Sequence, residues 1–297
     1  MPSGRGRFAP SPTGDLHLGS LVTALASFLD AQSRGDEWLL RLEDIDQART
    51  RPDAAEHIFS TLKSLGFQWP EPVLVQSKNL QAYENALDSL QTQGRLFVCT
   101  CGRGDYQDIY SGHCRKRGRL APGQIRPATG VAIRLLTAGT GVVDWQDDWQ
   151  GRQRQDVEHE VGDFVVRRKD GFHSYQLAVV VDDAMQGITR VVRGADLLDN
   201  TPRQIVLQRL LGVPSPSYAH GPLVLEADGS RLAKSRSSAA VSRLPPGVAL
   251  RLALGLLKQP SPPPPCTDVR EIQAHAVRHW NPSVLYNFLE TRLDSRG

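Results

Sequence analysis

RFAPSPTGDLHLGS, residues 7–20, is the stretch from which the fold of this 297-residue chain can be predicted. Residues 5–9 favour a short strand, which two prolines and a glycine end in an irregular turn. From Leu18 onward apolar residues recur at helical spacing, and Gly35 is a typical helix end. A turn between a strand and a helix N-terminus is a natural anion site, because free backbone N–H groups and the positive end of the helix dipole face one crevice. His17 adds an imidazole there that can donate to a phosphate oxygen.

The composition is that of an ordinary globular protein, with 40% apolar and 23% charged residues. The length allows one large domain, or a large and a small one. The net charge is only +3, so nucleic-acid binding would need local basic patches. No apolar run approaches the roughly 20 residues of a membrane span, and the N-terminus has no signal-peptide core. We therefore expect a cytoplasmic protein without a membrane segment, and a monomer.

Strand and helix patterns alternate through the first 98 residues. Strands are predicted at 37–42, 73–75 and 95–98, and helices from about Pro52 and across 80–90. Alternation with short loops indicates an α/β fold with a doubly wound parallel sheet. Such sheets bind ligands at the carboxyl ends of their strands, where Glu43 and the acidic residues after it follow the strand at 37–42.

The alternation stops at Cys99, and the residues up to 130 are rich in Gly and Arg without a clear period. Cys99, Cys101 and Cys114 supply three thiols, which are preferred ligands of structural zinc. Three unrelated free cysteines are the alternative. Chemistry alone nominates His113 as the fourth ligand, although its position next to Cys114 strains simultaneous ligation. We therefore predict a zinc-binding insertion over residues 99–130.

The second half returns to regular structure. A strand is predicted at 131–136, a hairpin from 163–166 and 174–181 around a turn at 169–171, and a further strand at 188–192. A helix should begin near Pro202 and end at Gly212. Two modest helical segments are expected beyond Gly247, interrupted by the prolines of 262–265.

Two motifs in this order resemble the class I aminoacyl-tRNA synthetases. Pro10-Ser11-Pro12-Thr13-Gly14 followed by His17-Leu18-Gly19-Ser20 is similar to the first signature of the glutamyl branch, and Arg231-Leu232-Ala233-Lys234-Ser235 to its lysine loop. A lone histidine before a helix is more often a polar cap, but two motifs at this separation favour the active-site interpretation. The Cys-x-Cys insertion and the short C-terminal region resemble the glutamyl-Q tRNA(Asp) synthetase family.

The resemblance implies a fold and a reaction. The fold is a class I Rossmann-like catalytic domain, with its first half at 1–98, its second half and lysine loop at 131–246, and a helical region at 247–297 without an anticodon-binding domain. The reaction is activation of L-glutamate by ATP without tRNA, then transfer of glutamate to queuosine in the anticodon of tRNA(Asp). Mg²⁺ is expected with ATP.

The resemblance also implies roles for individual residues. ATP is expected at His17, Gly19, Lys234 and Ser235, with His17 and Lys234 as the catalytic donors to the phosphates. The implied glutamate site consists of Arg7, Phe8, Ala9, Pro10, Ser11, Glu43, Tyr175 and Arg193. In it the two arginines meet the carboxylates and Glu43 meets the ammonium group. Tyr110 is the fourth zinc ligand in the family pattern.

Two other functions fit the sequence. One is a shortened glutamyl-tRNA synthetase that charges the 3′ end of tRNA, and the other is a non-catalytic zinc-dependent RNA-binding module. The basic run at 115–119 is usually a solvated face, although beside a zinc insertion it suits contact with tRNA phosphates.

Overall fold

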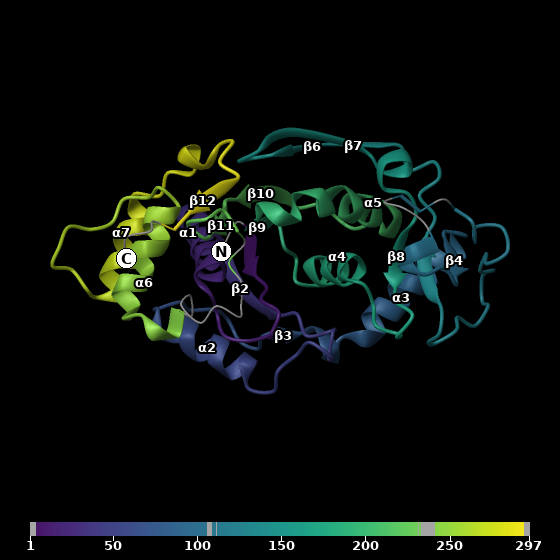
Figure 1. Cartoon of the computed structure of the whole chain (residues 1–297), viewed down its shortest axis with the longest axis horizontal. Coiled ribbons are helices and arrows are strands. Elements are labelled where there is room, and N and C mark those ends of the chain that lie inside the picture. The colour runs from purple at the N-terminus through teal and green to yellow at the C-terminus, as the bar shows by residue number, and fades with distance from the viewer. Residues whose placement is uncertain (1–3, 106–108, 111, 231, 233–240, 294–297) are drawn as a thin grey trace.

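A computed structural model of the chain describes residues 4–105, 109–110, 112–230, 232 and 241–293. Figure 1 shows an elongated molecule with a parallel sheet and helices α1, α6 and α7 toward one end and a smaller sheet containing β4 and β8 at the other. The bounds of these helices are Leu18–Arg34 for α1, Pro246–Leu256 for α6 and Val269–Arg278 for α7.

The parallel strands come from both halves of the sequence. The first group has the order β1 (Arg5–Phe8), β2 (Glu37–Leu42), β3 (Leu74–Val75), and the second group places β10 (Ser217–Gly221) between β9 (Arg190–Gly194) and β6 (Val142–Asp147). The backbone N–H of Thr189 donates to the Arg5 carbonyl oxygen at 3.0 Å, which joins the start of β9 to β1. The predicted α/β fold with a parallel sheet is therefore present.

Helix α1 explains why the N-terminal stretch organises the domain. Its apolar residues are buried, and Gly35 ends the helix in the left-handed region at φ 70°. An aromatic cluster packs against this helix. Phe28, in α1, contacts the rings of Trp38 and Phe67 edge-to-face, and those two rings stack on each other, with centroids 5.1–5.5 Å apart. The α-helices between α1 and α6 are α2 (Ala54–Ser64), α3 (Leu80–Thr92), α4 (Tyr175–Met185) and α5 (Thr201–Leu211).

The smaller sheet is antiparallel. Its order is β4 (Leu96–Cys99), β5 (Ala132–Leu135), β8 (Phe164–Arg167). The strand predicted at 95–98 thus forms as β4, but the expectation that it continues the parallel alternation is wrong. Residues on both sides of the predicted insertion, 96–99 and 132–135, pair with each other, so the cysteine segment begins and ends at one sheet.

The predicted hairpin over 163–181 is wrong in its second arm. Residues 175–185 form helix α4, and the Ser174 hydroxyl caps it by accepting from the Leu177 backbone N–H at 3.4 Å. Of the run of valines that suggested a strand, Val179 and Val180 are buried within the helix. A short continuous apolar run fits a buried strand or a buried helix equally well, so periodicity cannot separate them.

The remaining elements close the molecule. Strand β7 (Gly151–Asp156) forms a hairpin with β6, and β11 (Leu223–Leu225) pairs with β12 (Glu290–Arg292). Helices α6 and α7 confirm the two helical segments predicted around the proline run. Among the described residues, every helix is too short or too polar to cross a membrane.

Candidate active site

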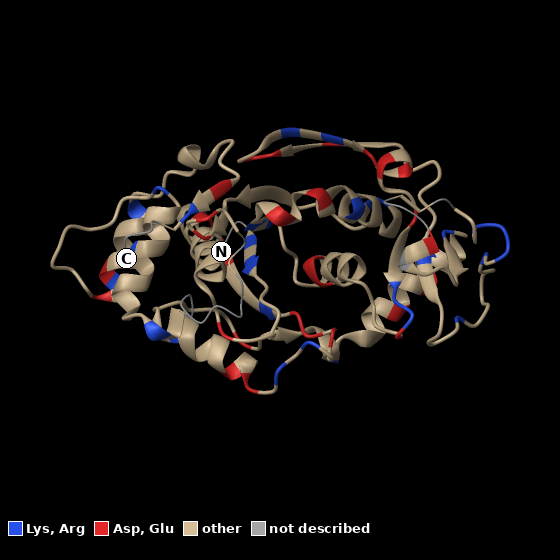
Figure 2. Cartoon of the chain, viewed as in Figure 1, with Lys and Arg blue, Asp and Glu red and all other residues tan. Residues whose placement is uncertain are grey.

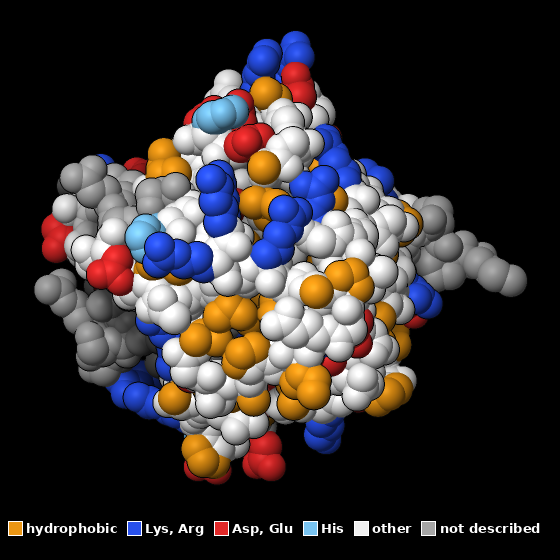
Figure 3. Space-filling view, turned by 90° about the vertical axis from the view of Figure 1, so that its right-hand side faces the viewer, with side chains coloured by type: hydrophobic (Ala, Val, Ile, Leu, Met, Phe, Trp, Pro, Cys, Tyr) orange, Lys and Arg blue, Asp and Glu red, His pale blue; other side chains and the backbone are white. Residues whose placement is uncertain are grey.

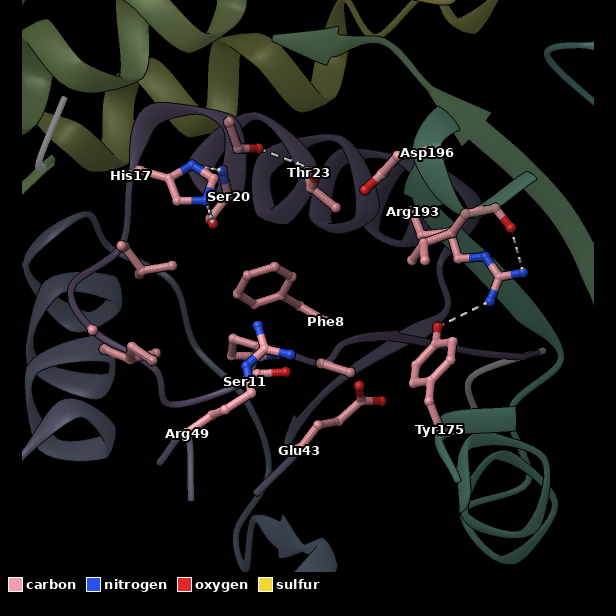
Figure 4. Close-up of a pocket in the computed structure, with 18 of the residues that line it drawn as sticks. Phe8, Ser11, His17, Ser20, Thr23, Glu43, Arg49, Tyr175, Arg193 and Asp196 are labelled. Carbon is pink, nitrogen blue, oxygen red and sulfur yellow. Dashed lines mark hydrogen bonds between the residues drawn. The ribbon is translucent and has the colours of Figure 1, made fainter. Parts of the chain in front are cut away.

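A pocket of about 760 Å³ opens at the carboxyl ends of β1, β2 and β9 (Figure 4). It brings together ten of the residues predicted from the sequence, which are Arg7, Phe8, Ala9, Pro10, Ser11, His17, Gly19, Glu43, Tyr175 and Arg193. In Figure 4, His17 lies at one end of the pocket and Arg193 with Tyr175 at the other. Lys234 and Ser235 lie outside the described residues.

His17 is the N-cap of α1. Its Nδ1 accepts the Ser20 backbone N–H at 3.1 Å, and its Nε2 lies 3.0 Å from the Ser20 hydroxyl. Since Nδ1 acts as the acceptor, Nε2 carries the proton of the neutral ring. A Cβ on Gly19 would lie 3.2 Å from His17 Nδ1, so glycine at that position leaves room for the imidazole.

A buried charge network supports one wall of the pocket. Asp183, on α4, accepts hydrogen bonds from Arg7 Nε at 3.1 Å and Arg41 Nη1 at 2.7 Å, and Arg41 Nη2 reaches Glu43 at 3.3 Å. Burial alone would raise the pKa of Asp183, but the two guanidinium groups outweigh it and hold the pKa below its usual value. Arg7 is therefore fixed in place by an ionised partner.

Glu43 differs from Asp183 in its ionisation. Burial raises the pKa of Glu43, and the nearby Arg41 and Arg7 offset that rise only in part. Burial disfavours the ionised form of a carboxyl group, and a cation placed next to the group stabilises that ionised form. Glu43 therefore suits an ammonium group in the pocket.

Arg193, at the end of β9, faces the pocket with its charge available. Its guanidinium donates to Tyr175 Oη at 3.3 Å and to the Leu197 carbonyl at 3.4 Å, and both of these residues line the pocket. Within the described part of the chain, no Asp or Glu oxygen lies within the 4.0 Å of an ion pair with Arg193. Burial raises the pKa of Tyr175, so its hydroxyl stays protonated. Two arginines and one carboxylate thus match a zwitterionic ligand that carries extra negative charge.

Several site residues were not predicted from the sequence. Arg41 and Asp183 orient Arg7, and Thr23, Arg49 and Asp196 line the pocket (Figure 4). The prediction of residues 174–181 as a strand concealed the role of Asp183. A signal was present in Asp182-Asp183, because two adjacent carboxylates after an apolar run require buried partners.

One described residue of the predicted lysine loop, and a described residue that follows the loop, lie near this pocket. Leu232 lines the pocket, and the Val241 backbone N–H donates to the carbonyl oxygen of Leu16 at 3.0 Å, directly before His17. Leu232 and Val241, the described residues nearest to Lys234 on either side of it in the sequence, therefore both lie close to the pocket or to the start of α1.

The three clustered thiols come together as the sequence predicted. The sulfur atoms of Cys99, Cys101 and Cys114 all lie within 4.8 Å of one another. The Tyr110 hydroxyl lies 3.5 Å from Cys99 Sγ and accepts the Cys114 backbone N–H at 2.8 Å, whereas His113 is exposed. Three thiols and a buried phenol oxygen form a donor set of the size that a tetrahedral metal ion needs, and sulfur donors suit zinc.

Comparisons with known proteins give a consistent result. The model of the family described as tRNA synthetases class I (E and Q), catalytic domain, matches residues 5–244. Proteins named glutamyl-Q tRNA(Asp) synthetase are 47% identical in Aromatoleum aromaticum, over 93% of this chain and 88% of the relative, and 49% identical in Xanthomonas campestris pv. campestris, over 95% and 93%.

A solved structure shares the fold. A glutamate tRNA ligase from Elizabethkingia meningosepticum in complex with its amino acid superposes with a TM-score of 0.78. The match covers 98% of this chain and 67% of the ligase at 22% identity, so it supports the fold alone.

Proposed function

Because the chain belongs to the class I tRNA synthetases for glutamate and glutamine, among relatives named glutamyl-Q tRNA(Asp) synthetase, and is a ligase of that type, we propose that it activates L-glutamate with ATP and transfers it to queuosine in tRNA(Asp). The observation that carries the first step is the pocket itself. It holds two arginines and a buried carboxylate at one end and an imidazole at a helix N-terminus at the other.

The charges of the pocket support one orientation of the substrates. The glutamate carboxylates lie toward Arg7 and Arg193 and its ammonium toward Glu43, while the triphosphate extends toward His17 and α1. One carboxylate oxygen attacks the α-phosphorus in line, the bond to the bridging oxygen breaks, and pyrophosphate leaves. His17 Nε2–H and Lys234 stabilise the charge that develops on the phosphate oxygens. Mg²⁺, held mainly by phosphates and water, accompanies ATP.

Pyrophosphate exchange measures this step. ATP labelled in the presence of glutamate, and of no other amino acid, is the expected result, and absence of exchange with glutamate would reject the proposal. Lys234→Ala should reduce exchange strongly while leaving the Kd of glutamate within about twofold, because the lysine acts on the triphosphate.

The second step requires an RNA surface. Lys116, Arg117 and Arg119 are exposed beside β4, where Arg119 bridges to Phe97. Figure 2 shows basic residues on the loops at this end of the molecule, and Figure 3 shows Lys and Arg side chains in a band across the face that forms it. Phosphate contact at this band suits a protein whose net charge is only +3.

Transfer of labelled glutamate to tRNA(Asp) tests the second step. Incorporation that needs queuosine is the expected result, and the label should survive removal of the 3′-terminal nucleotide. Label on the 3′ ribose would instead favour a shortened glutamyl-tRNA synthetase. RNA binding without ATP turnover would favour the non-catalytic module.

Zinc is proposed as a structural ion of the segment 99–130. Cys99, Cys101, Tyr110 and Cys114 would hold it, and the guanidinium carbon of Arg134 lies 4.0 Å above the Tyr110 ring in a cation–π contact that helps to fix the ring beside the thiols. The ion would cross-link a loop-rich segment with a small core of its own.

The proposed organisation follows from this reaction. Residues 1–98 and 131–246 form the two catalytic halves, and residues 247–297 form a helical region. The catalytic pocket itself meets the anticodon loop. We propose that the protein acts as a monomer in the cytoplasm, where ATP and tRNA are available.

A further inference from the structure

A row of buried side chains lies behind Arg193, on the side away from the pocket. It crosses three adjacent strands, from Asp147 at the end of β6 through His220 in β10 to Arg193 in β9. Asp147 and His220 are fully buried. Neither residue lines the pocket, so neither can touch a substrate there.

Asp147 is held as an anion that fixes the imidazole. Its Oδ1 accepts three backbone N–H groups, from Trp149 at 3.1 Å, Gln150 at 2.9 Å and His220 at 3.2 Å. Its Oδ2 lies 2.5 Å from His220 Nδ1. Burial opposes ionisation, yet the hydrogen bonds from His220 and the backbone keep the pKa of Asp147 below its usual value. Nδ1 of His220 therefore carries the proton.

With the proton on Nδ1, Nε2 of His220 has a free lone pair. Arg193 Nε donates to it at 2.9 Å. Burial lowers the pKa of His220 in spite of the bond to Asp147, and Arg193 lowers it further, which favours the neutral ring that this contact needs. A protonated ring would have no acceptor for Arg193.

The bonds of Arg193 differ between its two sides. Those on the buried side are short, at 2.8 Å to Gln204, 2.9 Å to Thr201 and 2.9 Å to His220. Those on the pocket side, to Tyr175 and Leu197, measure 3.3 and 3.4 Å. A ligand carboxylate can replace the long pair at little cost, while the short set keeps the guanidinium aimed.

We propose that His220, with its tautomer set by Asp147, is a positioning residue that aims Arg193 at a carboxylate of the amino-acid substrate. The inference rests on the proposed function, because it assumes that Arg193 meets that carboxylate. It predicts that the affinity for the amino acid depends on Nε2 of His220 being a hydrogen-bond acceptor, and not merely on the bulk of the side chain.

The variant Asp147→Asn distinguishes an effect of the His220 tautomer from an effect of side-chain bulk. The amide oxygen can still accept the three backbone N–H groups, while the amide NH₂ turns toward His220 and favours the tautomer with the proton on Nε2, which cannot accept from Arg193. The KM for glutamate in pyrophosphate exchange should rise about 10- to 100-fold, the range of a hydrogen bond to a charged group. The KM for ATP should stay within about twofold, because the triphosphate lies at the His17 end.

His220→Gln is the matched rescue, because its amide offers one donor and one acceptor, and its KM for glutamate should stay within about fivefold of the wild-type value. His220→Leu, which keeps bulk without an acceptor, should resemble Asp147→Asn. His275→Gln, on α7 outside the pocket, is the control and should leave the KM for glutamate unchanged. Thermal unfolding of each variant distinguishes a loss of folding from a change in the orientation of Arg193.

The outcomes separate the inference from the proposed function. A wild-type protein without glutamate-dependent exchange would remove the proposed function. An active wild type, together with a folded Asp147→Asn whose KM for glutamate is unchanged, would overturn the inference alone. The tautomer has its own readout, since ¹⁵N NMR of the imidazole should show His220 protonated at Nδ1 in the wild type, and protonation at Nε2 would also overturn it.

Discussion

Asp183 holds Arg7 from a distance of 176 positions in the sequence, with Oδ1 of the carboxylate 3.1 Å from Nε of the guanidinium. Both groups are buried, and the same oxygen also accepts from Arg41. One carboxylate in α4 thus sets the direction of the arginine that begins the pocket.

Asp183→Asn should destabilise the fold by about 3–5 kcal/mol near pH 7, because it leaves two buried guanidinium groups without their shared anion. The pKa of Asp183 is lowered in the folded state, so its contribution is present above the unfolded-state pKa and is lost as the pH falls through the folded-state value. Urea unfolding at several pH values should therefore show the two proteins converge in acid.

The neighbouring residue provides the control for that variant. Burial raises the pKa of Asp182, although Tyr83, Gln76 and Asn79 all donate to it. The folded state therefore gains less from its negative charge, and Asp182→Asn should cost less at pH 7 than Asp183→Asn. An equal cost for both would contradict the assignment of Asp183 as the shared anion.

Glu43→Gln should weaken glutamate binding while it raises the stability of the fold near pH 7. The raised pKa of Glu43 means that ionising it disfavours the folded state above that pKa, so Gln should stabilise the protein near pH 7 and lose this advantage in acid. The same change removes the partner of the ammonium group, and the Kd of glutamate should rise about 10- to 100-fold. Calorimetry gives the Kd and thermal melts give the stability.

Glu37→Gln is the comparison for that prediction. Glu37 pairs with the exposed Arg5 at the start of the sheet, outside the pocket, and should change the Kd of glutamate by less than about twofold. Normal glutamate binding by Glu43→Gln would remove Glu43 from the proposed site.

Gly19→Ala should lower activity although alanine favours helices. A Cβ at position 19 would lie 3.2 Å from Nδ1 and 3.3 Å from Cε1 of His17, so the imidazole has to move. We expect kcat of pyrophosphate exchange to fall about 10-fold or more, as a displaced donor requires. Gly255→Ala, inside α6 with no atom near the new methyl group, should keep full activity and add about 0.5–1 kcal/mol of stability.

The fourth zinc ligand can be identified by substitution. Tyr110→Phe removes the buried phenol oxygen beside the thiols and should weaken zinc retention during dialysis against a chelator, as should Cys99→Ser. His113→Ala removes an exposed side chain and should retain zinc. The metal content of each variant, measured by mass spectrometry, shows whether Tyr110 or His113 is the fourth ligand. Loss of zinc from His113→Ala alone would assign that role to His113.

Local patterns predicted the N-terminal part of the fold well. Residues 18–34 carry their apolar face and their Gly35 stop within one segment, so the limits of α1 follow from periodicity and capping. The ten pocket residues that the family resemblance implied also line one pocket; most of them come from strand ends or from the segment that begins α1, whereas Tyr175 comes from the start of α4.

The partners of each strand and the buried residues that hold the pocket side chains could not be predicted from the sequence. Residues 177–181 are a continuous apolar run that fits a strand or a helix, so only the tertiary structure identifies them as helix. The partners of β4 and the row from Asp147 to Arg193 depend on contacts between residues that are far apart in the sequence. Pattern analysis of one sequence contains no information about such pairs.

The long separation between Arg7 and Asp183 has a consequence during protein synthesis. At roughly 5–20 residues per second, a ribosome needs on the order of 10–30 s after making Arg7 before it adds Asp183. Throughout that interval the nascent chain contains the residues of β1 but lacks the anion that accompanies Arg7 in the finished molecule. A translation product that stopped within the antiparallel sheet would keep this uncompensated cation in place of a binding site, and it would be a natural substrate for quality-control proteases.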